Sequence, residues 1–105
     1  MKISKTELLR YSKQIILKKI GVLGQKKIFS TKILIVGMGG LGCPLALYLA
    51  NTGTGNIGIV DNDKVDISNL NRQILFNTKD VGKYKVVQAK KFLNKTNKKI
   101  KINIY

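Results

Sequence analysis

Three glycines follow an apolar run with the spacing GxGxxG, namely Gly37, Gly39 and Gly42. Such a turn lets backbone N–H groups approach phosphate oxygens, and the helix after it directs the positive end of its dipole at the same anion. Asp61 lies nineteen positions after Gly42, where a carboxylate can accept hydrogen bonds from ribose hydroxyls. The pattern therefore predicts a site for a nucleotide or a dinucleotide.

A segment rich in amides and charge comes after Asp61. It reads Ser68-Asn69-Leu70-Asn71-Arg72-Gln73, and Lys85 follows the glutamine by twelve residues. Arginine offers phosphate a planar fork and lysine a compact charge, so Arg72 and Lys85 favour phosphate chemistry over a plain dehydrogenase site. From composition alone, however, Lys85 is one more solvated lysine on a basic helix. Asn69 and Asn71 also remain open to a role as turn formers that cap the loop.

Periodicity indicates the elements that position these residues. Apolar strands are predicted over 33–36 and 56–60, and a helix of about ten residues between them has Pro44 in its first turn and ends before Gly53. The first of these strands is apolar on both faces, which is typical of a central parallel strand covered by helices on each side. After a loop to about residue 83, the apolar positions of 84–93 outline another helix.

The two ends of the chain carry weaker patterns. Ser4 and Glu7 have the spacing of a capping box, which predicts an amphipathic helix over 5–19 that Gly21 stops. A short helix is predicted around 25–29. Isoleucines alternate with polar residues over 100–104, the period of a half-exposed edge strand.

Together these elements predict an α/β fold, a Rossmann-like doubly wound parallel sheet. Right-handed crossovers place its three strands in the order 3-2-1. We expect N-terminal helices in 1–31, and in 32–105 a partial ATP-binding domain that is truncated after the third strand. The strand over 33–36 then lacks a neighbour on one flank, so we expect the chain to be the N-terminal part of a longer protein.

Composition narrows the class of protein. The formal net charge is +15, from 20 lysines and arginines against 5 acidic residues. This excess favours acidic partners, although an AT-rich genome, such as that of an organelle, yields the same lysine-rich composition without functional pressure. The single cysteine, Cys43, excludes an internal disulfide and fits a small apolar filler. No apolar stretch is long enough to span a bilayer, so we expect a location in the cytoplasm, or in the plastid stroma if an organelle encodes the protein.

The order and spacing of these motifs resemble the N-terminal half of the ThiF/MoeB adenylyltransferases, relatives of the ubiquitin-activating enzymes. The motifs that carry the resemblance are Arg10-Tyr11-Ser12-Lys13-Gln14, GMGGLG from Gly37, VDNDKVD from Val60, SNLNRQ from Ser68 and VGKYK from Val81. The resemblance implies that ATP adenylates the C-terminal glycine carboxylate of a small ubiquitin-like sulfur-carrier protein, for molybdopterin or thiamine synthesis. It also implies a homodimer.

The resemblance also implies roles for individual residues. Gly40 lies at the phosphates, Asp61 holds the ribose, the segment from Ser68 to Arg72 lines the nucleotide, and Arg72 and Lys85 contact the phosphate groups as catalytic cations. An arginine that reaches a neighbouring subunit's nucleotide in the family is Lys13 here, which keeps the charge and loses the bidentate geometry. The family's Mg²⁺-binding aspartate would lie beyond Tyr105, so this chain is expected to contribute no metal ligand.

Two other classes of function compete with this interpretation. A nicotinamide-dependent oxidoreductase would account for the glycine turn and Asp61, and it leaves SNLNRQ and Lys85 unexplained. A noncatalytic basic module that binds nucleic acid is permitted by the charge. The sequence disfavours it because an interleaved aromatic surface is missing: most aromatic residues are expected in the core. The aromatic residues are Tyr11, Phe29, Tyr48, Phe76, Tyr84, Phe92 and Tyr105.

Overall fold

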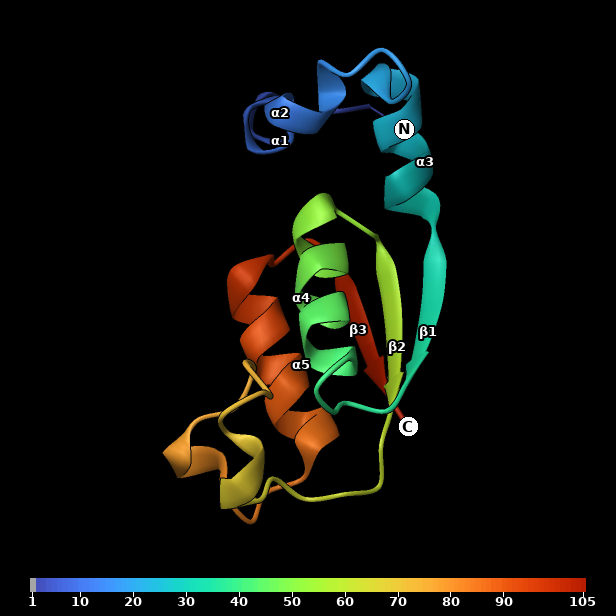
Figure 1. Ribbon diagram of the computed structural model, residues 1–105. Coiled ribbons are helices and arrows are strands. Elements are labelled where there is room, and N and C mark those ends of the chain that lie inside the picture. Colours follow the sequence, from blue (N-terminus) through green and yellow to red (C-terminus); the bar gives the residue numbers. More distant parts are fainter. Residues whose placement is uncertain (1) are drawn as a thin grey trace.

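The computed structural model describes residues 2–105 and contains one parallel sheet of three strands (Figure 1). The strands are β1 (Lys32–Val36), β2 (Asn56–Val60) and β3 (Lys101–Ile104), hydrogen-bonded in the order β1-β2-β3. The predicted parallel α/β sheet is confirmed. The central position is taken by β2, because the described residues supply no strand to the free edge of β1.

Helices precede and connect the strands. The helices before β1 are α1 (Lys5–Arg10), α2 (Ser12–Ile15) and α3 (Gly21–Ser30). The connections are α4 (Gly42–Thr52) between β1 and β2, and α5 (Lys85–Thr96) before β3. The long loop that leads to α5 contains two 3₁₀ turns, η1 (Ile67–Asn69) and η2 (Thr78–Asp80).

The core lies between the sheet and two helices, α4 and α5, which pack side by side on one face (Figure 1). Ile35, Ile57 and Ile102 are buried from the three strands, and small residues such as Ala46 and Ala89 let the helices approach them. Burial of this kind stabilises the fold by roughly 25 cal/mol per Å² of apolar surface.

The opposite face of the sheet carries no helix from the described residues. Leu34 is 59% exposed and Val36 is 77% exposed, and a hollow of about 690 Å³ lies over this face between Lys32 and Tyr105. The expectation that helices cover β1 on both faces is therefore wrong for this chain. Both connections from β1 through β3 place their helices on the same side, which leaves the second face open.

The boundaries of α4 agree with the residue types at its ends. Pro44 lies in the first turn, where its missing N–H is not required. Gly53 ends the helix in the left-handed conformation, with φ of 92°. A side chain on Gly53 would also collide with Gln25, Phe29 and Tyr11, each 2.9 Å from the position of its Cβ. Gly53 therefore ends α4, and its lack of a side chain leaves room for the side chains of the N-terminal helices to pack against it.

The prediction of one helix over 5–19 is wrong. The capping box at Ser4 and Glu7 is present, but the helix breaks at Tyr11, and α2 ends at Ile15. Gly21, with φ of 59°, is the first residue of α3 and does not end the preceding helix. At the break Tyr11 is buried, and its ring makes an edge-to-face contact with Phe29, with the ring centroids 5.3 Å apart.

Polar side chains attach these N-terminal helices to the ends of α4 and α5. Gln14 and Gln25 both donate to the Thr52 carbonyl at 2.9 Å, and the Gln14 amide also donates to Gln25. The Asn97 amide donates to the Tyr11 hydroxyl at 2.7 Å and to the Ala50 carbonyl at 3.0 Å.

The helices project beyond the amino ends of the strands, which gives the molecule extents of 42 × 23 × 21 Å (Figure 1). Six large apolar side chains of this region remain exposed, namely Leu8, Leu9, Ile16, Leu17, Val22 and Leu23. The amphipathic face predicted here is therefore not buried within one chain.

Candidate functional site

The glycine turn at the carboxyl end of β1 is built from backbone contacts that only glycine permits. Gly37 has φ of 95° and donates to the Val60 carbonyl at 2.7 Å, which ties the turn to β2. A Cβ on Gly42 would lie 1.9 Å from the Gly37 carbonyl oxygen. By contrast, a Cβ on Gly39 would meet nothing within 4 Å. The turn is thus tightly closed at Gly42 and open at Gly39, where phosphate oxygens could approach.

Asp61 lies at the tip of β2 and is fixed by two backbone N–H groups. Its Oδ2 accepts from Met38 in the glycine turn at 2.8 Å, and its Oδ1 accepts from Asp63 at 2.7 Å. Each oxygen keeps a further lone pair for a ligand hydroxyl. The carboxylate therefore joins the turn to the second strand and remains able to bind a ribose.

The loop between β2 and α5 is closed at its base by a short antiparallel ladder. Val65 donates to the Lys83 carbonyl and Gly82 donates to the Val65 carbonyl, both at 2.8 Å. The Lys85 N–H donates to the Asp63 carbonyl at 3.0 Å, and the Lys64 ammonium lies 5.1 Å from the centre of the Tyr84 ring. These contacts fix where α5 begins, and with it the position of Lys85.

Arg72 brings a guanidinium to the glycine turn. A Cβ on Gly40 would meet the Arg72 Cδ at 3.5 Å and its Nε at 3.9 Å, so this side chain lies along the turn. The Nη1 atom donates to the Ser68 carbonyl and to the Asn71 side chain, both at 3.2 Å. Asn71 thus orients the guanidinium, whose remaining donors are available to a phosphate.

Lys85 is the first residue of α5 and only 6% exposed. Within residues 2–105 its ammonium forms no ion pair. Burial raises the pKa of the Cys43 thiol to about 11, against smaller lowering effects from the Leu75 N–H and from Lys85. Cys43 is a buried thiol at the glycine turn that donates to the Met38 carbonyl at 3.3 Å.

The remaining residues of the predicted segment have structural contacts. Leu70 packs against the core. Asn69 accepts from the Asp66 N–H at 3.1 Å, so this asparagine caps the η1 turn. Ser68 donates to Asp66 through both its N–H and its hydroxyl, at 2.9 and 2.8 Å, and these two bonds lower the pKa of the Asp66 carboxyl.

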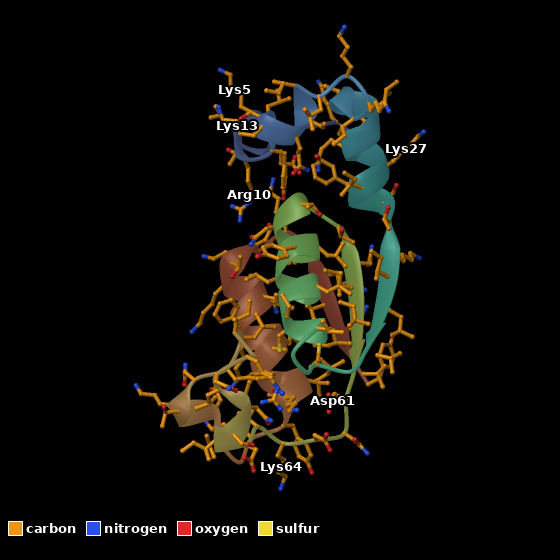
Figure 2. The ribbon with its side chains drawn as sticks, viewed as in Figure 1. Lys5, Arg10, Lys13, Lys27, Asp61 and Lys64 are labelled. Atoms are coloured by element: carbon orange, nitrogen blue, oxygen red, sulfur yellow. The ribbon has the colours of Figure 1, made fainter. Side chains whose placement is uncertain are left out.

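Lys13 is not brought to this site within its own chain. It lies on α2 beyond the amino ends of the strands, whereas Asp61 lies at the carboxyl ends (Figure 2). Within one chain the glycine turn, Asp61, the segment from Ser68 to Arg72 and Lys85 share one end of the sheet.

Sequence reasoning assigned no role to two residues of this end, although both lie within the motifs that carry the family resemblance. Asp66 anchors Ser68, and the spacing Asp-x-Ser of an Asx turn would have indicated it. Gln73 is only 3% exposed, and its side-chain oxygen has no partner among residues 2–105. No spacing rule marks a buried glutamine, so only the fold identifies it.

The described residues also limit what else this end can bind. Residues 2–105 contain no group of three or more histidine, cysteine or carboxylate side chains that could hold a metal ion. Among the same residues, no helix is long and apolar enough to cross a membrane.

Comparison with curated proteins gives relatives over nearly the whole chain. The chain is 48% identical over 103 residues to the adenylyltransferase and sulfurtransferase UBA4 of Debaryomyces hansenii, covering 97% of this chain and 23% of that protein. It is 47% identical over 104 residues to the adenylyltransferase and sulfurtransferase MOCS3 of Culex quinquefasciatus, covering 99% of this chain and 24% of that protein. The chain thus spans about a quarter of the length of these relatives.

Comparison with solved structures agrees. E. coli MccB, solved with ATP, matches with a TM-score of 0.86 and 36% identity, over 91% of this chain and 30% of that one. The model of the ThiF family matches residues 11–105 and includes every part of the site described above. The chain therefore belongs to the ThiF family.

Proposed function

We propose that the chain is the amino-terminal part of an ATP-dependent adenylyltransferase that activates the C-terminal glycine carboxylate of a ubiquitin-like sulfur-carrier protein, in molybdopterin or thiamine synthesis. The observation that carries this proposal is Arg72 lying along Gly40, at the end of the sheet that also holds Asp61 and the buried Lys85. The planar guanidinium of Arg72 and the compact ammonium of Lys85, beside the N-termini of α4 and α5, fit a chain of phosphates. The names of UBA4 and MOCS3 as adenylyltransferases support the same chemistry.

In this proposal each residue has a defined task. Asp61 accepts from the ribose hydroxyls, and the open backbone at Gly39 and Gly40 receives the phosphates. When a carboxylate attacks the α-phosphorus and pyrophosphate leaves, negative charge increases on the phosphate oxygens. Arg72 and Lys85 stabilise that charge, and their fixed positions avoid reorganisation during the reaction. Removing one such group costs roughly 3 kcal/mol of transition-state stabilisation.

ATP chemistry of this kind uses Mg²⁺ to neutralise phosphate charge. The described residues do not fit a complete metal site, since no cluster of three metal-binding side chains is present among them. We therefore assign no step to the metal through this chain. The aspartate that the family resemblance implies as its ligand would lie after Tyr105, in a longer protein with a doubly wound sheet.

The exposed apolar side chains of α1 through α3 support a homodimer. Leu9, Ile16 and Leu23 are each more than 70% exposed, which is a large apolar surface for helices of one chain. Pairing through this region would bring Lys13 close to the partner subunit, in keeping with its implied role at a neighbour's nucleotide. The compartment we propose is the cytoplasm, or the plastid stroma if an organelle encodes the protein.

Ligand binding by the chain tests the nucleotide assignment. Calorimetric titration should detect ATP and not NAD, and Arg72→Ala should weaken the binding of ATP. Firm binding of NAD with no binding of ATP would favour the oxidoreductase alternative. Adenylation itself is tested by carrier-dependent exchange of pyrophosphate into ATP with the complete enzyme. Absence of exchange with ubiquitin-like carriers that end in Gly-Gly would overturn the proposed reaction.

A further inference from the structure

Positive and negative charges are segregated along the molecule. Four of the five carboxylates lie within residues 61–80, in the loop at the carboxyl end of the sheet. Residues 2–31, which form the N-terminal helices, hold eight lysines and arginines and a single acidic residue, Glu7. In Figure 2, Asp61 and Lys64 lie at one end of the molecule and Lys5 and Arg10 at the other. The end formed by the N-terminal helices is therefore strongly positive.

A groove lies at this positive end, between α1 and the turn that follows α5. It is a hollow of about 260 Å³, and we call it the junction groove. Four cations line it, namely Arg10, Lys95, Lys98 and Lys99, together with Glu7 and Thr96. Cations that line one small hollow repel one another less when an anion lies between them. The groove thus has the shape and the charge of an anion site.

The one carboxylate in the junction groove is already occupied. Glu7 accepts from the Ser4 N–H at 3.0 Å, which is the main reason why its pKa is lowered, and it pairs with Lys99 at 3.8 Å. Among residues 2–105 this is the sole ion pair. Arg10, Lys95 and Lys98 therefore keep their charges without a carboxylate partner in the described chain.

Arg10 indicates that the junction groove is a structured site and not only a result of the lysine-rich composition. The chain has eighteen lysines and only two arginines, and the other arginine, Arg72, lies at the nucleotide turn. The Arg10 Nη2 donates to the Thr96 carbonyl, which holds the guanidinium at the wall of the groove. A fixed guanidinium loses little conformational freedom when it binds a phosphate through its other donors. The AT-rich composition that could explain the many lysines does not account for this arginine.

We propose that the junction groove binds the backbone phosphates of a single nucleic-acid strand. The cations of the groove come from α1 and from the end of α5, so a polymer with several phosphates meets more of these charges than a free phosphate does. The absence of an interleaved aromatic surface argues against reading of bases and not against contact with phosphates. Tyr11 at the groove is only 4% exposed, so bases have no ring to stack on there. RNA and DNA strands are therefore expected to bind with similar affinity.

Fluorescence anisotropy of the whole chain with labelled oligonucleotides of about ten residues tests this proposal. The test variant is Lys95→Gln with Lys98→Gln. The matched control is Lys27→Gln with Lys18→Gln, which removes the same charge. Lys27 lies in the last turn of α3, as Lys95 lies in the last turn of α5, and it points away from the groove (Figure 2). Circular dichroism checks that both variants are folded.

Titrations between about 50 and 200 mM salt give the number of phosphate contacts from the slope of log K against log salt. The test variant should bind roughly tenfold more weakly, and the magnitude of its slope should fall by about 1.4, since each phosphate contact of a single strand contributes about 0.7. The control should change by less than about twofold. Equal loss in both variants, or equal affinity for a polyglutamate peptide, would overturn the proposal.

Discussion

The two ends of the sheet are held by different kinds of hydrogen bond. In the loop at the carboxyl end, side chains bind N–H groups two residues away, as Asp61 binds Asp63, Asp66 binds Ser68 and Asn77 binds Lys79. The exception is the bond from Met38 to Asp61, which joins residues 23 positions apart. At the amino end, the contacts that attach the N-terminal helices join residues from 27 to 86 positions apart. The loop at the site is therefore shaped largely by its own sequence, whereas the attachment of the helices depends on the completed fold.

The largest effect is expected at the carboxyl end, from Gly42→Ala. The added Cβ would lie 1.9 Å from the Gly37 carbonyl oxygen and 2.9 Å from the carbon, and backbone atoms cannot move aside as a flexible side chain does. We expect a loss of about 3 kcal/mol or more in the free energy of unfolding, measured by urea denaturation.

Gly39→Ala is the control for this substitution, since its Cβ would meet nothing within 4 Å. This variant should keep its stability and lose affinity for ATP, because the methyl group enters the space open to phosphates. If Gly39→Ala destabilised the chain as much as Gly42→Ala, the closed and open halves of the turn would not differ.

Substitutions of Arg72 test the chemistry at the carboxyl end of the sheet. In the complete enzyme, Arg72→Ala should lower adenylation turnover about a hundredfold, because the guanidinium stabilises charge that develops on the phosphate. Arg72→Lys should recover only part of the rate, since lysine lacks the planar fork that Ser68 and Asn71 orient. Equal turnover of the arginine and lysine forms would show that the fork is unimportant.

The buried Cys43 thiol at the glycine turn makes the free energy of unfolding depend on pH. Burial raises the pKa of Cys43 to about 11, so the folded chain holds this proton more tightly than the unfolded chain does. The resulting stability is fully present below about pH 9 and is lost as the pH rises toward 11. The free energy of unfolding should fall by about 2 to 3 kcal/mol over that window. Cys43→Ala should fall less steeply, and parallel curves for the two proteins would contradict this account.

At the amino end, Asn97→Ala tests the long-range attachment. The substitution leaves the Tyr11 hydroxyl and the Ala50 carbonyl without their donor. We expect a loss of about 2 kcal/mol in the free energy of unfolding. Tyr11→Phe removes one of the two bonds and should cost less, and hydrogen exchange should show faster opening of α1 and α2 than of β2. Uniform opening of the whole chain would show that the two ends are not separate cooperative units.

The residues of the candidate site were largely predictable because they depend on local backbone geometry. Gly37 must adopt positive φ, Gly53 must end α4 in the left-handed conformation, and Asp61 must follow a buried strand. Each of these demands is expressed within a few residues of sequence. The loop from Asp66 to Ser68 follows the same rule, since Asp66 accepts from the N–H two residues further on.

The sequence by itself determined the parallel strands, the glycine turn and the placement of charge, since each rests on local periodicity or residue type. Only the tertiary structure decided the break at Tyr11, the burial of Gln73 and the contact of Arg72 with Gly40. These features depend on groups that approach from distant positions or from the other side of a turn. Helical periodicity over 5–19 describes a continuous helix, and the bonds from Asn97 and the ring of Phe29 favour a broken one.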